Sequence, residues 1–265
     1  MIIMKILIVI DDYFNKSNGM SISTQRFVKQ FQKMGHEVRV LASIAGGEPD
    51  YPLPIMTIPI FKNIIAKEGF HFAKPEKKTI EKAVKWADLV HLEDPFPVCA
   101  CAGKIAKRFK KPITGTFHLY PENLTASVPI LDHPSINSTF MKLFRDTTFN
   151  YCNYLQCPTA KVKQRLQKYH FKSKLITISN GISDYYLQDN QRELKNDSFT
   201  ILSIRRFSNE KDQKTLIKAI SLSKHKNKIC LILAGKGPLK SEYIELCRKL
   251  KINAQLAFYS RDELK

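Results

Sequence analysis

A short basic turn, "RRFSNEKD" at residues 205–212, carries the residue types best suited to binding an anion. It follows the apolar stretch "FTILSI" and precedes the helix-like stretch "QKTLIKAISLS". Arg206 and Lys211 would therefore add fixed positive charge to the positive end of a helix dipole. Because basic residues are also common in solvated surface turns, the turn alone leaves both interpretations open.

Three glycines and one histidine occupy similar strand-to-helix loops. Gly19 lies in "DDYFNKSNGMS", and Gly235 and Gly237 lie in "AGKGP". A glycine there lets a phosphate approach backbone amides at a helix start, although an ordinary turn would also explain it. The loop around Gly19 lacks the GxGxxG pattern, which argues against a nicotinamide dinucleotide. His118 ends the strand-like "PITGTFH", and a lone histidine in that place is more often structural than functional.

The elements that must position these residues alternate along the whole chain. Apolar strand-like runs and amphipathic helical segments follow one another, a pattern that predicts an α/β fold with parallel sheets covered by helices. Residues 1–188 are predicted to form a first Rossmann-like, doubly wound domain. Residues 189–197 would be a polar linker, and residues 198–265 would begin a second, incomplete domain of the same kind. The carboxyl ends of adjacent parallel strands meet at one edge, so the basic turn and the "GKGP" loop should share an anion pocket. His118 would face the cleft between the two domains.

The formal net charge of +19 on 265 residues predicts an anionic partner. A nucleic acid is disfavoured because no recognition motif or stacking platform is visible. No uninterrupted apolar run approaches transmembrane length, and the six cysteines are expected to be reduced thiols. Residues 61–74, "FKNIIAKEGFHFAK", interleave lysines with apolar side chains, as in a segment lying on an anionic membrane; a partly buried loop is the alternative. The apolar residues of that segment are Phe61, Ile64, Ile65, Phe70 and Phe72.

Taken in order, a set of motifs resembles the retaining glycosyltransferases of family 4, which have the two-domain GT-B fold. The motifs are Gly19, "TFH" (116–118), "ISNGI" (178–182), "RFSNEK" (206–211) and "GKGP" (235–238). Segments such as "SNGMSISTQRF" and "FHLYPENL" are most similar to the bacterial lipid α-glucosyltransferases that act on cholesterol or diacylglycerol.

The resemblance implies a hexosyltransferase that uses a nucleotide sugar, UDP-glucose, and a membrane-lipid hydroxyl as acceptor, with retention of configuration. Arg206 and Lys211 would neutralise the leaving diphosphate, and Gly19 would meet it from the other side. His118 would lie near the transferred sugar. Neither a metal nor another cofactor is expected. The protein would be cytoplasmic and peripheral, at the inner face of the membrane.

Two departures from the family pattern accompany the resemblance. Arg205 stands where the family usually has glycine, and the E-x7-E motif expected downstream of "GKGP" does not occur between Pro238 and Lys265. The chain is therefore expected to be truncated at its carboxyl end. The alternative function is an inactive or split fragment that only binds an anionic membrane or a complementing C-terminal chain.

Overall fold

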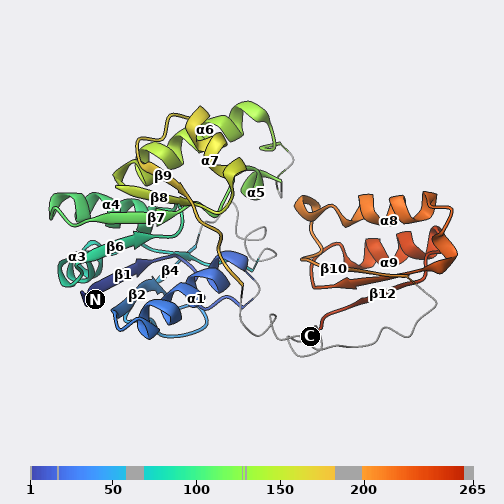
Figure 1. Ribbon diagram of the computed structural model, residues 1–265, viewed down its shortest axis with the longest axis horizontal. Coiled ribbons are helices and arrows are strands. Elements are labelled where there is room, and N and C mark those ends of the chain that lie inside the picture. Colours follow the sequence, from blue (N-terminus) through green and yellow to red (C-terminus); the bar gives the residue numbers. More distant parts are fainter. Residues whose placement is uncertain are drawn as a thin grey trace. The chain divides into compact units, whose positions relative to one another are not determined.

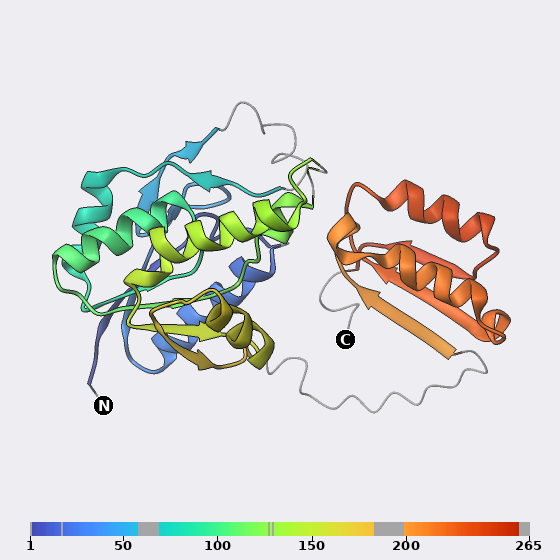
Figure 2. The same ribbon diagram turned by 90° about the horizontal axis from the view of Figure 1, so that it is seen from above.

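The computed structural model describes residues 2–16, 18–57, 69–126, 128, 130–182 and 199–259. The chain divides into two compact units, Met1–Ile182 and Ser183–Lys265 (Figures 1 and 2). The predicted linker, residues 189–197, lies outside the described residues.

The first unit is built on a seven-stranded sheet with the order β3-β2-β1-β6-β7-β8-β9. Every pair of neighbouring strands in it is parallel. The strands are β1 (Lys5–Val9), β2 (Glu37–Ser43), β3 (Tyr51–Leu53), β6 (Leu89–Leu92), β7 (Ile113–Thr116), β8 (Tyr154–Cys157) and β9 (Lys174–Thr177). A short antiparallel pair, β4 (Ile55–Met56) with β5 (Phe72–Ala73), lies outside this sheet.

Central strand β1 shows why the sheet needs helices on both faces. Its residues alternate between two apolar clusters: Ile6 and Ile8 belong to one, and Leu7 and Val9 belong to the other. A strand buried on both sides is continuously apolar, as "ILIV" (residues 6–9) is. Helix α1 (Gly19–Lys33) contributes Val28 to the first cluster. The second cluster draws on α3 (Lys77–Trp86), α4 (Pro97–Arg108), α6 (Pro134–Thr147) and α7 (Ala160–Lys168).

The second unit has a parallel sheet of three described strands, β10 (Phe199–Ile204), β11 (Ile229–Ala234) and β12 (Ala254–Ala257). Helices α8 (Gln213–Leu222) and α9 (Lys240–Lys249) lie on the same side of it (Figure 1) and share its apolar core. On β10, Leu202 and Ile204 alternate with core residue Ile201 and are 49% and 53% exposed. The predicted α/β class with two parallel-sheet units is confirmed. Within the second unit, the described helices α8 and α9 leave the opposite face of the sheet uncovered.

Candidate functional site

The basic turn of the second unit follows β10 and leads into α8, as predicted. Arg206 is half-buried just after the strand, whereas its neighbour Arg205 is exposed. Lys211, also half-buried, ends the short 3-10 helix Asn209–Lys211 that precedes α8. The carbonyl of Arg206 accepts a hydrogen bond of 3.0 Å from the side-chain amide of Gln213, which is only 2% exposed. The first residue of α8 thus fixes the backbone that carries Arg206.

The "GKGP" loop lies directly against this turn. The amide of Phe207 donates to the carbonyl of Lys236 over 2.9 Å, and the amide of Leu239 donates to the carbonyl of Phe207 over 3.2 Å. A Cβ added to Gly235 would lie 2.0 Å from the carbonyl oxygen of Arg205, and one on Gly237 would lie 2.3 Å from that of Phe207. Close packing of one loop backbone on the other therefore requires both glycines, whatever ligand binds there. The predicted meeting of the two loops is found.

Gly19 in the first unit has a different environment. It is the first residue of α1, and the side chain of the preceding Asn18 accepts hydrogen bonds from Met20 N (2.9 Å) and Ser21 N (3.5 Å). A Cβ added to Gly19 would meet no described heavy atom within 4 Å. Packing within the described residues therefore does not explain a glycine at this helix start, where an anion would be favoured.

His118 lies just beyond the carboxyl end of β7 and has an acidic partner that the sequence patterns did not identify. Its Nε2 is 2.8 Å from Oε2 of Glu93, which follows β6 and is fully buried. The other oxygen of Glu93 is 3.6 Å from Nε2 of His91, a residue of β6. His91 also lies 2.8 Å from Thr114 Oγ1 and 3.0 Å from Thr116 Oγ1, both on β7. A polar network therefore supports His118 at this edge.

The charge on Glu93 follows from these contacts. Burial alone would raise the pKa of Glu93, but His91, a hydrogen bond from His118 and one from Thr24 together hold that pKa below its ordinary value. Burial lowers the pKa of His91 despite the nearby carboxylate of Glu93. Glu93 is thus an ionised carboxylate inside the protein, which is stable only because donors surround it.

A pair of buried aspartates, also missed from the sequence, lies just beyond the ends of β1 and β6. The amide of Asp11 donates to Oδ2 of Asp94 over 2.7 Å, and the amide of Ala73 donates to Oδ2 of Asp11 over 3.0 Å. Burial raises the pKa of Asp11 well above its ordinary value, and Asp94 raises it further; burial also raises the pKa of Asp94 to about 6. In the sequence, "DD" and "ED" follow two apolar strand-like runs, but these letters do not specify which residues become partners.

The five residues predicted on the acceptor or membrane side divide between described and undescribed parts of the chain. Phe61, Ile64 and Ile65 lie outside the described residues. Phe70 and Phe72 are half-buried and pack on Phe96, with ring centroids 5.5 and 4.8 Å from it. Their predicted role as acceptor or membrane contacts stays a prediction.

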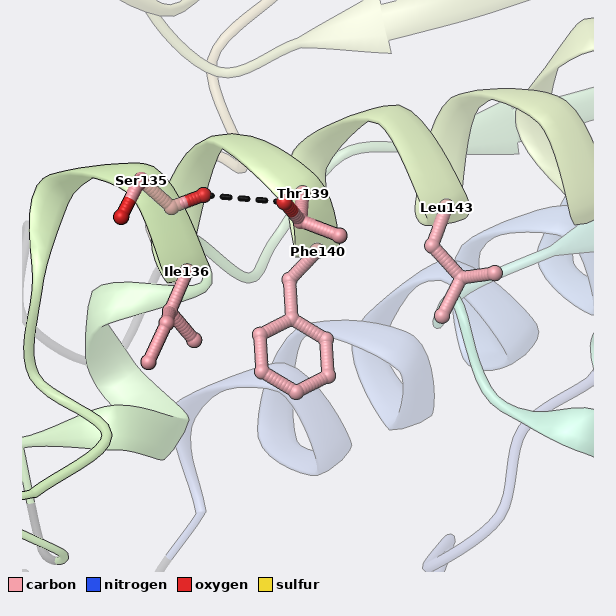
Figure 3. A pocket seen from close by; sticks show the side chains of 5 residues that line it. All are labelled: Ser135, Ile136, Thr139, Phe140 and Leu143. Carbon is pink, nitrogen blue, oxygen red and sulfur yellow. Dashed lines mark hydrogen bonds between the residues drawn. The ribbon is translucent and has the colours of Figure 1, made fainter.

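An apolar groove of about 320 Å³ lies along α6 (Figure 3). Ile136, Phe140 and Leu143 project from the same side of the helix in this view, and the hydroxyl of Thr139 donates to the carbonyl of Ser135 over 2.9 Å. None of the predicted site residues lines this groove.

Two features are absent from the part of the chain that the structure describes. In that part of the chain, no three or more His, Cys, Asp and Glu side chains are grouped so that they could hold a metal ion. The described helices also include none with the length and apolar character needed to cross a membrane.

Two Rossmann-like units with such loops at the carboxyl ends of their strands have the architecture of the GT-B glycosyltransferases. Residues 17–184 match Glycosyltransferase Family 4, and residues 186–265 match the glycosyl transferases group 1. The chain belongs to glycosyltransferase family 4.

One curated protein and two solved structures illustrate what this chain is similar to. The alpha-monoglucosyldiacylglycerol synthase of Streptococcus pneumoniae is 24% identical over 272 residues, which cover 96% of this chain and 61% of that protein. The Anabaena protein HepE, solved with UDP and glucose, superposes with a TM-score of 0.67 at 14% identity, over 97% of this chain and 70% of HepE. The pneumococcal O-GlcNAc transferase GtfA, solved with UDP and GlcNAc, gives a TM-score of 0.63 at 11% identity, over 98% of this chain and 77% of GtfA. These structures show the fold, and the chain spans 61% of the length of its curated relative.

Proposed function

We propose that this chain carries the acceptor unit and part of the donor unit of a glycosyltransferase that moves glucose from UDP-glucose to a membrane-lipid hydroxyl, with retention of configuration. The observation that carries the proposal is the pairing of the basic turn with the "GKGP" loop at the carboxyl edge of β10 and β11. Parallel sheets of this type bind their ligands at that edge. The match of this region to the glycosyl transferases group 1 and the similarity to a glucosyldiacylglycerol synthase support the assignment.

On the donor side, Arg206 and Lys211 are the cations that would stabilise the UDP leaving group. As the bond between glucose and phosphate breaks, negative charge grows on the departing diphosphate, and fixed cations lower the energy of that state. Two such cations can supply the electrostatic role that a metal has in other phosphate chemistry. We therefore expect no metal requirement. Gly19 would admit the diphosphate at the start of α1, where packing leaves room.

On the acceptor side, the charge and the apolar groove favour a lipid. The formal charge of +19 would hold the protein on the anionic inner face of the membrane. Ile136, Phe140 and Leu143 would offer an apolar wall to an alkyl chain. The proposed location is thus cytoplasmic and peripheral.

A transfer assay tests this proposal directly. The chain would be incubated with UDP-glucose and phosphatidylglycerol vesicles containing diacylglycerol or cholesterol, and glycolipid would be quantified by mass spectrometry and its anomer assigned by NMR. Arg206→Ala should lower the rate by about 100-fold or more, as expected for loss of a charge that stabilises the transition state. Arg205→Ala is the matched control, because the exposed neighbour should be dispensable. Equal rates for wild type and Arg206→Ala would refute the assignment of Arg206 to the leaving diphosphate.

A second candidate function is a non-catalytic chain that binds a complementing C-terminal polypeptide. The exposed Leu202 and Ile204 on the open face of the second sheet favour it, because parallel sheets are normally covered on both faces. Calorimetry with UDP separates the two functions. No heat of binding at millimolar UDP would favour the non-catalytic chain, whereas binding that Arg206→Ala abolishes would favour the enzyme.

A further inference from the structure

Glu93 occupies an unusual position for an acidic residue. It is completely buried, and three separate elements supply its partners: His118 follows β7, His91 lies in β6, and Thr24 lies in α1. Its Oε1 lies 3.6 Å from Nε2 of His91 and has no hydrogen bond of normal geometry among the described residues. Its Oε2 is 2.8 Å from Nε2 of His118.

Stability of the fold does not explain this arrangement. A buried carboxylate costs several kcal/mol of desolvation, and replacing such a pair with apolar residues of similar volume is often neutral or stabilising. The apolar cluster at the neighbouring strand β1 avoids this desolvation cost, because it contains Ile6, Ile8 and Ile10. The acid at the end of β6 therefore needs another explanation.

The contact with His118 provides that explanation, because one nitrogen of a neutral imidazole ring donates a hydrogen bond and the other accepts one. Within the described part of the chain, the ring of His118 contacts Glu93 through Nε2. A carboxylate only accepts hydrogen bonds, so Nε2 must carry the proton. In a neutral imidazole the other nitrogen, Nδ1, is then an acceptor. His118 follows β7, at the carboxyl edge of the sheet, where ligands of this fold bind.

We propose that Glu93 is a positioning residue that fixes the proton of His118 on Nε2, so that Nδ1 accepts a hydrogen bond from a hydroxyl of the transferred hexose. The identity of that hydroxyl-bearing ligand rests on the proposed function. The tautomer and the orientation of the ring do not, because they follow from the contact with Glu93 alone.

The test is NMR of the full chain with nitrogen-15-labelled histidine at a pH where the rings are neutral. Loss of one ring signal in His118→Ala assigns it among the seven histidines. In wild type we expect protonated Nε2 and unprotonated Nδ1. Glu93→Gln, whose amide oxygen can still accept, should retain this tautomer, and Glu93→Leu should lose it. Asp12→Asn is the matched control, because this buried acid contacts His71 and should leave the His118 signal unchanged.

A proton on Nδ1 in wild type, or an unchanged His118 signal in Glu93→Leu, would overturn the inference. If Glu93→Leu does not fold, the wild-type tautomer and Glu93→Gln still decide the question. In the transfer assay, Glu93→Leu should lower kcat about 10-fold to 100-fold, with a smaller change in KM for UDP-glucose, because a misplaced group impairs chemistry more than binding. If wild type transfers no glucose but shows the expected tautomer, the proposed function fails and the role of Glu93 in orienting His118 stands.

Discussion

The glycine at position 235 provides a sharp test of how the second unit is held together. In Gly235→Ala, the new Cβ would lie 2.0 Å from the carbonyl oxygen of Arg205. The two loops would have to separate by about 1.4 Å to reach the 3.4 Å of ordinary contact. Forced overpacking costs about 1–3 kcal/mol. The same separation strains the hydrogen bonds from Arg205 N to Ala234 O (3.0 Å) and from Gly235 N to Ala257 O (2.8 Å).

We therefore expect the free energy of local opening in the second unit to fall by about 3 kcal/mol, which corresponds to roughly 100-fold faster amide hydrogen exchange in β10 and β11. Exchange read by mass spectrometry suits this test, because the single tryptophan, Trp86, reports only on the first unit. Gly19→Ala is the control, since its added Cβ meets no described atom within 4 Å and should leave exchange in the first unit unchanged. Unaltered exchange in Gly235→Ala together with weakened UDP binding would refute the packing argument and leave close ligand approach as the reason for the glycine.

Three further outcomes are expected. The folded state raises the pKa of Asp11 above its value in the unfolded chain, so folding favours the protonated acid. The stability of the wild type should therefore fall as pH rises from about 4 toward the raised folded pKa. In Asp11→Asn, urea unfolding should show a flatter pH dependence and a higher stability at pH 8. The chain should float with phosphatidylglycerol vesicles in low salt and detach in 1 M NaCl, where the Debye length falls to about 3 Å; equal recovery with neutral vesicles would contradict an electrostatic attachment. EDTA should leave glucose transfer unchanged, and a loss of activity restored by Mg²⁺ would show that Arg206 and Lys211 do not suffice.

The helices and strands could be predicted well, because the apolar pattern of each lies within its own short stretch of sequence. A continuous apolar run such as "ILIV" (residues 6–9) predicts a strand buried on both faces, and the apolar spacing of the helix that begins at Gly19 predicts its buried face. The order of the elements then implies parallel strands, and parallel strands bring their following loops to one edge. For this reason the meeting of the basic turn with the "GKGP" loop could be predicted without any knowledge of contacts between them.

The buried acids could not be predicted in the same way. Glu93 and His118 are 25 positions apart and become partners only because β6 and β7 are neighbours in register. Asp11 and Asp94 are 83 positions apart and meet because β1 pairs with β6. Such pairs depend on strand order across the sheet, and an isolated "ED" after a strand is also what a solvated loop would contain.

The two arginines of the basic turn differ in the exposure and the direction of their side chains. Arg205 N donates to Ala234 O and Phe207 N donates to Lys236 O, so the backbone continues the parallel ladder with β11 past the end of β10. Consecutive side chains on an extended backbone point to opposite sides. The exposed side chain of Arg205 and the half-buried one of Arg206 therefore do not occupy the same space. The part of Arg205 that packs tightly is its carbonyl, which lies against Gly235. An arginine can thus stand where the family usually has glycine, because the close approach at this point involves its backbone and leaves its side chain in solvent.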